Sequence, residues 1–403
     1  MALPDGWWVY VAMPLFMALI GYVTKLLAIR MMFKPLEYRG WGPFGWQGVI
    51  PRRAARMAAV ACDLITTKLI GPRDILDRLD PDKVAAELEA PLLSTVDEIT
   101  REVMAQFQPG LWETLPESSR LLLIRRIQAE APEVIADLLR DIRADVDQVF
   151  DLKTMVVTNL VRDKHLLNRI FAEAGEEEFR FIARSGIFFG FAIGCLQALT
   201  WAVTQSPWIL PLFGAFTGWF TDWLALKLIF YPKQPRGFGW LRWQGLFLAR
   251  RERVTERYAA LIAQELITPH NLFEALLHGP LADRVFAMVQ RHVQRAVDAQ
   301  TGVARPLVVL AVGSSHYQDI KRAVAEQVME RLPTTLAYVE DYTAEAFDIK
   351  ATLVRKMRQL TDEEFEQLIR PAFQADEWIL ITVGAVLGFS MGELQVLALE
   401  RFA

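Results

Sequence analysis

A stretch of 43 residues occurs twice in this chain, 197 positions apart, and this repeat constrains the fold more than any single motif. Pro14–Arg56 aligns with Pro211–Arg253 without a gap, and 18 of the 43 aligned positions carry the same residue. Phe150–Lys153 returns as Phe347–Lys350, and GFAIGCLQAL at 190–199 returns as GFSMGELQVL at 388–397 after a slip of one residue. The sequence therefore predicts two copies of one structural unit, residues 1–204 and 205–403.

Each copy is expected to cross a membrane twice. Residues 185–221 contain no charged side chain, and Thr204–Pro207 gives a turn signal within them. One span needs about 20 apolar residues, so this stretch fits two. A secretory signal peptide is the alternative for the first segment. However, no basic region precedes this segment, and its counterpart in the second copy lies inside the chain. The predicted spans are about 7–28, 182–203, 207–228 and 378–399.

The distribution of Lys and Arg predicts the orientation of these spans. Residues 20–57 carry seven basic side chains and 217–258 carry eight, whereas residues 1–24 and the 204–207 turn carry none. Basic flanks stay on the cytoplasmic side. We therefore expect both termini outside and both long segments, about 30–180 and 229–377, in the cytoplasm. Both copies then point the same way, which is a parallel repeat with pseudo-twofold symmetry.

The long segments are predicted to be helical, so the fold class is all-α. Apolar residues recur at three- and four-residue spacing in 54–70, 83–106, 118–147 and 152–184, and no strand pattern of useful length appears. Hydrophobic content of 53% and a mean hydropathy of +0.20 fit a protein that is partly in the membrane and partly in water. The last helix of each copy is expected to run directly into the membrane.

The most specific local signal is a loop rich in Trp, Gly and Arg that follows the first span of each copy. Trp and Tyr favour the headgroup layer, and Arg pairs with lipid phosphate. Two interpretations stay open, a plain anchoring hairpin and a loop that binds lipid headgroups or lines a vestibule. The candidate interface residues are Arg39, Trp41, Trp46, Gln47, Gly48, Arg52 and Arg53, and Arg236, Trp240, Trp243, Gln244, Gly245 and Arg250.

A few polar residues fall within the predicted spans. Lys25 and Asp222 occupy equivalent positions, directly after Thr24 and Thr221, so their opposite charges could meet on the symmetry axis. Independent extension of each side chain to the membrane surface is the alternative. Glu393 lies late in the fourth span, where a solvated position is favoured over an ion or proton role.

Two stripes of glycine predict close helix packing. Gly186, Gly190 and Gly194 lie four residues apart, as do Gly384, Gly388 and Gly392. Small residues at this spacing let helices approach closely. The two stripes are expected to face each other across the pseudo-twofold axis, or to face another subunit.

No pattern of catalytic or metal-ligating residues emerges, so we expect neither an enzyme nor a cofactor. The five histidines show no ligand spacing, and Cys62 and Cys195 do not belong to the repeat. Gly40–Gly45 matches G-x-G-x-x-G only formally, because it follows a membrane helix and not a strand. Glu176–Glu178 and Asp362–Glu364 are expected to be solvated helix faces. The net charge of −4 indicates no nucleic-acid partner.

The repeated motifs resemble the family called domain of unknown function 445. Gly21–Pro35 reads G-Y-x-T-x-x-x-A-I-x-M-x-F-x-P, and 46–53 reads W-Q-G-x-I-P-R-R. The resemblance extends to Phe150–Lys153 and the glycine-striped last helix. Where that family usually has Thr-Asn, this chain has Thr24-Lys25 and Thr221-Asp222. The resemblance implies a bacterial cell-membrane protein and implies no activity.

Two functional hypotheses follow. The first is a non-enzymatic scaffold that contacts lipids of the inner leaflet through the interfacial loops, and that either forms homo-oligomers or binds a cytoplasmic protein. The second is a small transporter or channel formed by the four spans, with Lys25, Asp222 and Glu393 as its polar elements. A continuous water-sized tunnel through the spans would favour the second.

Overall fold

Helices make up nearly all of the structure. The computed structural model describes residues 7–41, 44–235, 244–301, 314–370 and 377–402. The all-α fold class is confirmed. Within these ranges the one β element is a hairpin of β1 (Arg39–Trp41) and β2 (Phe44–Trp46), which pair antiparallel with Gly40 opposite Gly45. The sequence missed it because three-residue strands are too short to give an alternating pattern.

The chain forms two compact units. The membrane unit comprises Met1–Leu64, Asn159–Leu261 and Val354–Ala403, and the second unit comprises Ile65–Thr158 and Ile262–Leu353. Each unit is built from both copies of the sequence repeat. The division into residues 1–204 and 205–403 is therefore a division of the sequence, and it stays a prediction.

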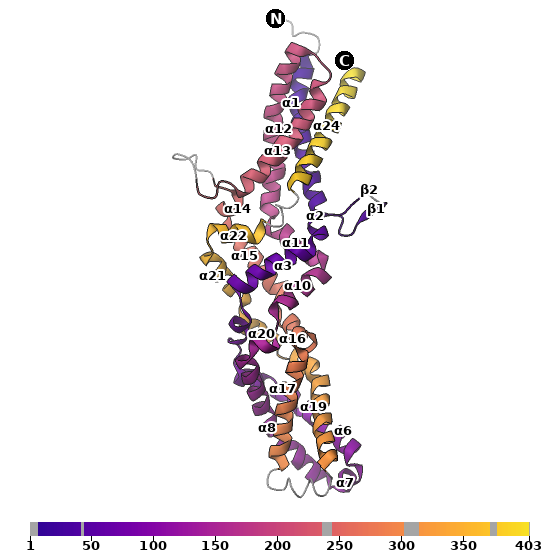
Figure 1. The fold of residues 1–403 in the computed structure, drawn as a ribbon, viewed down its shortest axis with the longest axis vertical. Helices are drawn as coiled ribbons and strands as arrows, with labels where there is room; N and C mark the ends of the chain where they lie inside the picture. The colour runs from indigo at the N-terminus through magenta and orange to yellow at the C-terminus, as the bar shows by residue number, and fades with distance from the viewer. Residues whose placement is uncertain (1–6, 42–43, 236–243, 302–313, 371–376, 403) are drawn as a thin grey trace. The chain divides into compact units, whose positions relative to one another are not determined.

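Four helices of the membrane unit are long and apolar enough to cross a membrane, which confirms the number of predicted spans. The candidate spans are Tyr10–Phe33, Glu176–Thr204, Ile209–Ile229 and Glu377–Leu397. They belong to α1 (Trp7–Phe33), α12 (Glu176–Thr204), α13 (Ile209–Phe230) and α24 (Glu377–Phe402), which lie side by side (Figure 1). The most extensive packing joins α1 to α12 and α13 to α24, the two helices of each copy.

The predicted single helix over 152–184 is wrong, because the chain forms three helices there. They are α10 (Leu152–Arg162), α11 (Lys164–Ala174) and the start of α12. The Asp163 side chain accepts hydrogen bonds from the backbone N–H groups of His165 and Leu166, which caps a new helix. Gly175 separates α11 from α12. The α12 helix itself continues from Glu176 into the candidate span, as expected.

Short helices follow α1 and α13 and also precede α24. They are α2 (Val49–Arg52), α3 (Ala54–Leu64), α14 (Leu246–Ala249), α15 (Arg251–Leu261), α21 (Ile349–Gln359) and α22 (Asp362–Ile369). Short helices also pack across the copies: α11 packs on α15, and α22 packs on α3. These two contacts are equivalent at the repeat offset. Each copy therefore completes the packing of the other, which explains why the membrane unit draws on both.

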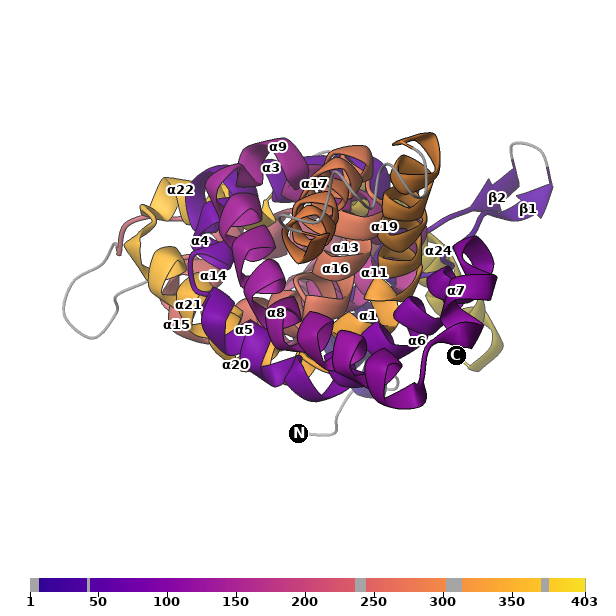
Figure 2. The same cartoon turned by 90° about the horizontal axis from the view of Figure 1, so that it is seen from below.

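In the second unit, too, helices of one copy pack on helices of the other. Its main helices are α6 (Glu89–Phe107), α8 (Glu117–Ala144), α17 (Ala282–Thr301) and α19 (Ser314–Ala337), and α17 and α19 lie side by side (Figures 1 and 2). Across the copies, α17 packs on α8 and α19 packs on α6. The shorter elements are α4 (Pro72–Leu76), α5 (Pro81–Glu87), α7 (Pro109–Thr114), α9 (Val146–Val149), α16 (Pro269–His278), α20 (Glu340–Phe347), and the π-helical turns Ile65–Leu69 and Ile262–Leu266.

Candidate functional site

A small cavity lies among the four membrane helices, near the end at which α1 and α13 stop and α12 and α24 start. We call this the basic end, because the Lys- and Arg-rich loops follow it. The cavity has a volume of about 40 Å³. Nine of its eleven lining residues are apolar, and the other two are Lys25 and Asp222. The structure thus brings these two equivalent residues, one from each copy, to the same place.

Both side chains are buried, but they differ in their hydrogen bonds. Lys25 is 1% exposed, and its Nζ donates a hydrogen bond to the backbone carbonyl of Thr221 at 2.8 Å. Asp222 is 6% exposed, and its Oδ2 has no hydrogen-bond partner. Among the described residues, no ion pair within 4.0 Å joins the two. A buried carboxylate oxygen without a donor is costly, so the two charged groups of the cavity differ in their stabilisation by the protein.

Glycine makes room for both charged side chains. A Cβ added to Gly186 would lie 2.9 Å from Lys25 Cδ, and a Cβ added to Gly384 would overlap Asp222 Oδ2. Toward the far end of the bundle, a Cβ at Gly194 would lie 2.6 Å from Pro14 Cα, and one at Gly392 would lie 2.5 Å from Pro211 Cα. The stripes of α12 and α24 therefore face α1 and α13, and not each other, because each copy packs its own two spans together.

Polar residues continue beyond the cavity but are interrupted by an apolar layer. Thr24 and Thr217 donate to the carbonyls of Ile20 and Phe213, one turn earlier in their helices. Next comes a cluster of Met17, Ile20 and Ile193, against which Phe213, Phe220 and Met391 pack. One turn past Ile193, Gln197 Nε2 lies 3.5 Å from Gln395 Oε1, and both side chains are buried. The cavity is thus separated from the glutamine pair by tightly packed side chains.

The two glutamines occupy equivalent positions of the repeat, yet sequence reasoning missed them. The available signal was an identical polar residue in two otherwise apolar segments. Glu393, which was singled out instead, is half-buried on α24, away from the residues that line the cavity.

The first interfacial loop divides into an anchored part and an exposed part. Trp46 Nε1 donates to the carbonyl of Met31 at 3.1 Å, and Gln47 Nε2 donates to that of Leu36 at 2.8 Å. Gly48 turns back onto the end of α1, where a Cβ would lie 2.9 Å from Lys34 N. By contrast, Trp41 is 93% exposed, and Arg39 and Arg52 are also exposed. Trp46 and Gln47 therefore hold the hairpin, and Trp41 is free to meet another surface.

The second loop is anchored in the same way where it is described. Gln244 Nε2 donates to the carbonyl of Lys233 at 3.0 Å, and Gly245 N donates to that of Pro232 at 3.0 Å. Arg236, Trp240 and Trp243 lie outside the described residues. Near this loop Lys233 Nζ lies 2.7 Å from Glu366, and this hydrogen bond raises the pKa of Lys233.

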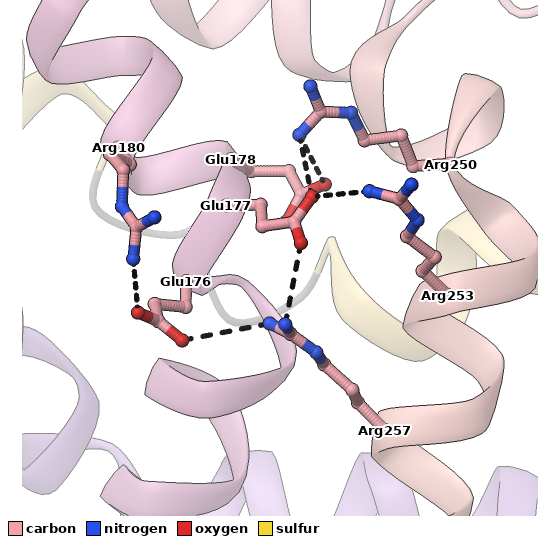
Figure 3. A network of polar contacts seen from close by, with 7 residues as sticks. All are labelled: Glu176, Glu177, Glu178, Arg180, Arg250, Arg253 and Arg257. Carbon is pink, nitrogen blue, oxygen red and sulfur yellow. Dashed lines mark hydrogen bonds and ion pairs between the residues drawn. The ribbon is translucent and has the colours of Figure 1, made fainter.

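An acid–base cluster joins the start of α12 to α15 (Figure 3). Glu177 Oε2 accepts from Arg250 and from Arg253, each at 3.1 Å, and its Oε1 lies 3.4 Å from Arg257. Glu178 is 2% exposed. The expectation of a solvated Glu176–Glu178 face holds for Glu176, which is exposed, and is wrong for Glu177 and Glu178, because arginines just before and within α15 cover them. Arg53, the counterpart of Arg250, is half-buried in the first copy.

The described residues hold no group of three or more His, Cys, Asp or Glu side chains that could bind a metal. Cys62 is buried near Tyr258, and burial, with Cys62 as a smaller contribution, raises the pKa of the Tyr258 phenol above its ordinary value. These groups pack at the centre of α3 and α15 and do not approach the cavity lining.

The chain is similar to proteins named UPF0754 membrane proteins, which form an uncharacterised family. It is 28% identical to one from Synechococcus sp. (strain JA-3-3Ab) over 98% of this chain and 99% of that protein. A second, from Synechococcus sp. (strain JA-2-3B'a(2-13)), is 27% identical over 43% of this chain and 49% of that protein. A third, from Nostoc sp., is 28% identical over 35% of this chain and 38% of that protein.

With the four apolar helices, these relatives identify the chain as a membrane protein. No family model matches the sequence, so the resemblance to domain of unknown function 445 stays a prediction.

Proposed function

We propose that this protein is a non-enzymatic membrane scaffold that contacts lipid headgroups at the inner leaflet through its β1–β2 hairpin. The observation that carries the proposal is the contrast between Trp46, whose Nε1 is bonded to the end of α1, and Trp41, which is 93% exposed on the same hairpin. An exposed Trp next to Arg39, directly after a membrane helix, matches the chemistry of the headgroup layer.

The packing between the two copies in the membrane unit supports a scaffold role. Helices of one copy pack on helices of the other, and the ion pairs of Glu177 join α12 of one copy to α15 of the other. Equivalent contacts recur at both copies, as with α11 on α15 and α22 on α3. We infer from this recurrence a parallel repeat with a pseudo-twofold axis along the bundle, on which Gln197 meets Gln395.

A depth measurement tests the lipid contact. A spin label is placed at Trp41→Cys after Cys62 and Cys195 are replaced by Ala, and the protein is studied in lipid nanodiscs. We expect the label to be more accessible to oxygen than to a water-soluble nickel chelate. A label at Leu122→Cys, a 70% exposed position on α8, is the matched control and should show the opposite order. Equal water exposure at both sites would contradict the proposal.

The orientation proposed with this function places both long segments in the cytoplasm and both termini outside. It rests on the basic residues that follow α1 and α13. A reporter that is active only outside the cytoplasm should be silent when fused at Pro109 or Thr301. The same reporter inserted after Thr204 should be active. Activity at Pro109 or Thr301 would reverse the orientation.

Lipids are the partners proposed first, and a second copy or a cytoplasmic protein is proposed for the second unit. The alternative function is a small transporter or channel through the four spans. The polar pair Lys25 and Asp222 favours it, whereas the packed layer of Met17, Ile20 and Ile193 opposes a tunnel. Mass spectrometry of lipids and proteins that co-purify in mild detergent tests the scaffold proposal. Solute flux measured in proteoliposomes tests the transporter alternative.

A further inference from the structure

The cavity at the basic end combines three features that a dry packing defect does not have. Its volume of about 40 Å³ is large enough for about three or four water molecules, given that one water needs about 10–15 Å³ of such space. Its lining includes Lys25, whose buried ammonium group makes one hydrogen bond, to the carbonyl of Thr221. It also includes Asp222, whose buried carboxylate oxygen Oδ2 has no hydrogen-bond partner. Purely apolar cavities of this size stay empty, but polar ones hold water.

The charges in the cavity decide between water and a metal cation as its occupant. Lys25 already places a positive charge in the wall, and the described lining holds no second carboxylate. A bound cation would have one negative group against it and one positive group beside it. Water can instead accept from Lys25 Nζ and donate to Asp222 Oδ2, which satisfies both groups at once.

The packing decides from which side that water can exchange. The lining extends to Met32 and Ile229, in the last turns of α1 and α13 at the basic end. In the other direction a packed apolar layer closes the bundle. It consists of the cluster Met17, Ile20 and Ile193, with Phe213 and Phe220 packed against it. Water that enters from the basic end therefore meets Asp222 and goes no further.

We propose that this cavity is a water-filled proton-binding site, in which Asp222 exchanges a proton with the basic end of the bundle only. A hydronium ion in the cavity transfers its proton to Asp222 Oδ2, which forms the O–H bond and leaves a water molecule. The reverse step returns the proton to water. The site goes beyond the scaffold function and does not depend on it.

Among the described residues that line the cavity, Lys25 is the one charged group that accompanies Asp222. It comes from α1, whereas α12 contributes Phe179 and Ile182 to the lining, and α24 contributes Leu380. The other lining residues from α13 are apolar. Asp222 thus exchanges its proton in surroundings set by one lysine and by water. Charged residues within the membrane commonly mark such proton sites.

The first test is access. Asp222→Cys and Ile20→Cys are made in a protein without Cys62 and Cys195, and each is exposed to silver ions in sealed vesicles of both orientations. We expect Asp222→Cys to react from one side only, and at least about tenfold faster than Ile20→Cys, because packed apolar side chains exclude a hydrated ion. Reaction from both sides, or no difference between the two positions, would overturn the proposal.

The second test is protonation. Infrared spectra of wild type and Asp222→Asn in nanodiscs are compared as the pH is lowered. We expect a protonated-carboxyl band in the wild type that the variant has lost, and that is retained in Ile20→Val. A wild-type spectrum that differs from Asp222→Asn by no titrating carboxyl band would overturn the proposal. If Asp222→Asn does not fold, the access test alone decides.

Discussion

Lys25 Nζ donates a hydrogen bond to the backbone carbonyl of Thr221 across 2.8 Å, which ties the first membrane helix of one sequence copy to that of the other. Thr221 is the counterpart of Thr24, so the lysine of one copy binds the residue that precedes its own counterpart, Asp222. A glycine opposes each of the two charged residues, Gly186 at Lys25 and Gly384 at Asp222. The two positions thus offer similar space.

This relationship predicts that exchanging the charges is milder than removing one. Lys25→Met should lower the stability in detergent by about 1.5–3 kcal/mol, because it removes a hydrogen bond from a charged group and leaves Asp222 as the sole charge. Lys25→Asp combined with Asp222→Lys should recover much of this loss, since the ammonium group moved to the second copy could reach the carbonyl of Thr24. Thermal unfolding of the variants measures the effect. Additive losses in the double variant would exclude the coupling.

A second prediction concerns the glycine contact between α12 and α1. A Cβ at Gly186 would overlap the carbonyl oxygen of Gly21 and press on Lys25 Cδ at 2.9 Å. Gly186→Ala should therefore separate the helices and destabilise the protein by about 1–3 kcal/mol. Gly110→Ala is the matched control, because nothing lies within 4 Å of a Cβ there. A loss for Gly110→Ala equal to that of Gly186→Ala would show that the effect is not close packing.

A third prediction concerns the cluster in Figure 3. Glu177 is 28% exposed and contacts three arginines, so Glu177→Ala should cost about 1 kcal/mol and leave Arg250, Arg253 and Arg257 to repel one another. Glu173→Ala removes only an exposed pair with Arg169 at 3.9 Å and should be close to neutral. High salt should reduce the difference between the two variants, since exposed ion pairs are screened. A salt-independent difference would point to packing instead.

A fourth prediction follows from the buried Tyr258. Burial raises the pKa of its phenol in the folded protein above the ordinary value of about 10, which applies in the unfolded chain. The unfolded chain then loses the proton first as pH rises. The contribution to stability is fully present below about pH 10 and is lost above it. Unfolding temperatures should fall less steeply above about pH 10 in Tyr258→Phe than in the wild type, and equal slopes would refute the effect.

The sequence by itself determined the four membrane helices and the helical character of the segments between them. Uncharged stretches of about 20 residues predicted four membrane helices, because a span must satisfy its backbone internally over the thickness of the bilayer. The same reasoning applied along the soluble segments, where apolar spacing indicated helices. It failed where a capping side chain such as Asp163, or a single Gly175, ended one helix and began another within a continuous apolar pattern.

The tertiary structure decided which helices of one repeat copy pack on which helices of the other. Nothing in the sequence shows that α11 packs on α15 of the other copy as well as on α3 of its own, because α3 and α15 are related by the repeat. The cavity likewise depends on four helices converging, so the sequence could place Lys25 and Asp222 at equivalent positions but could not show one side chain hydrogen-bonded and the other without a donor. That asymmetry arises because a lysine reaches a carbonyl on the neighbouring helix, whereas an aspartate can only accept.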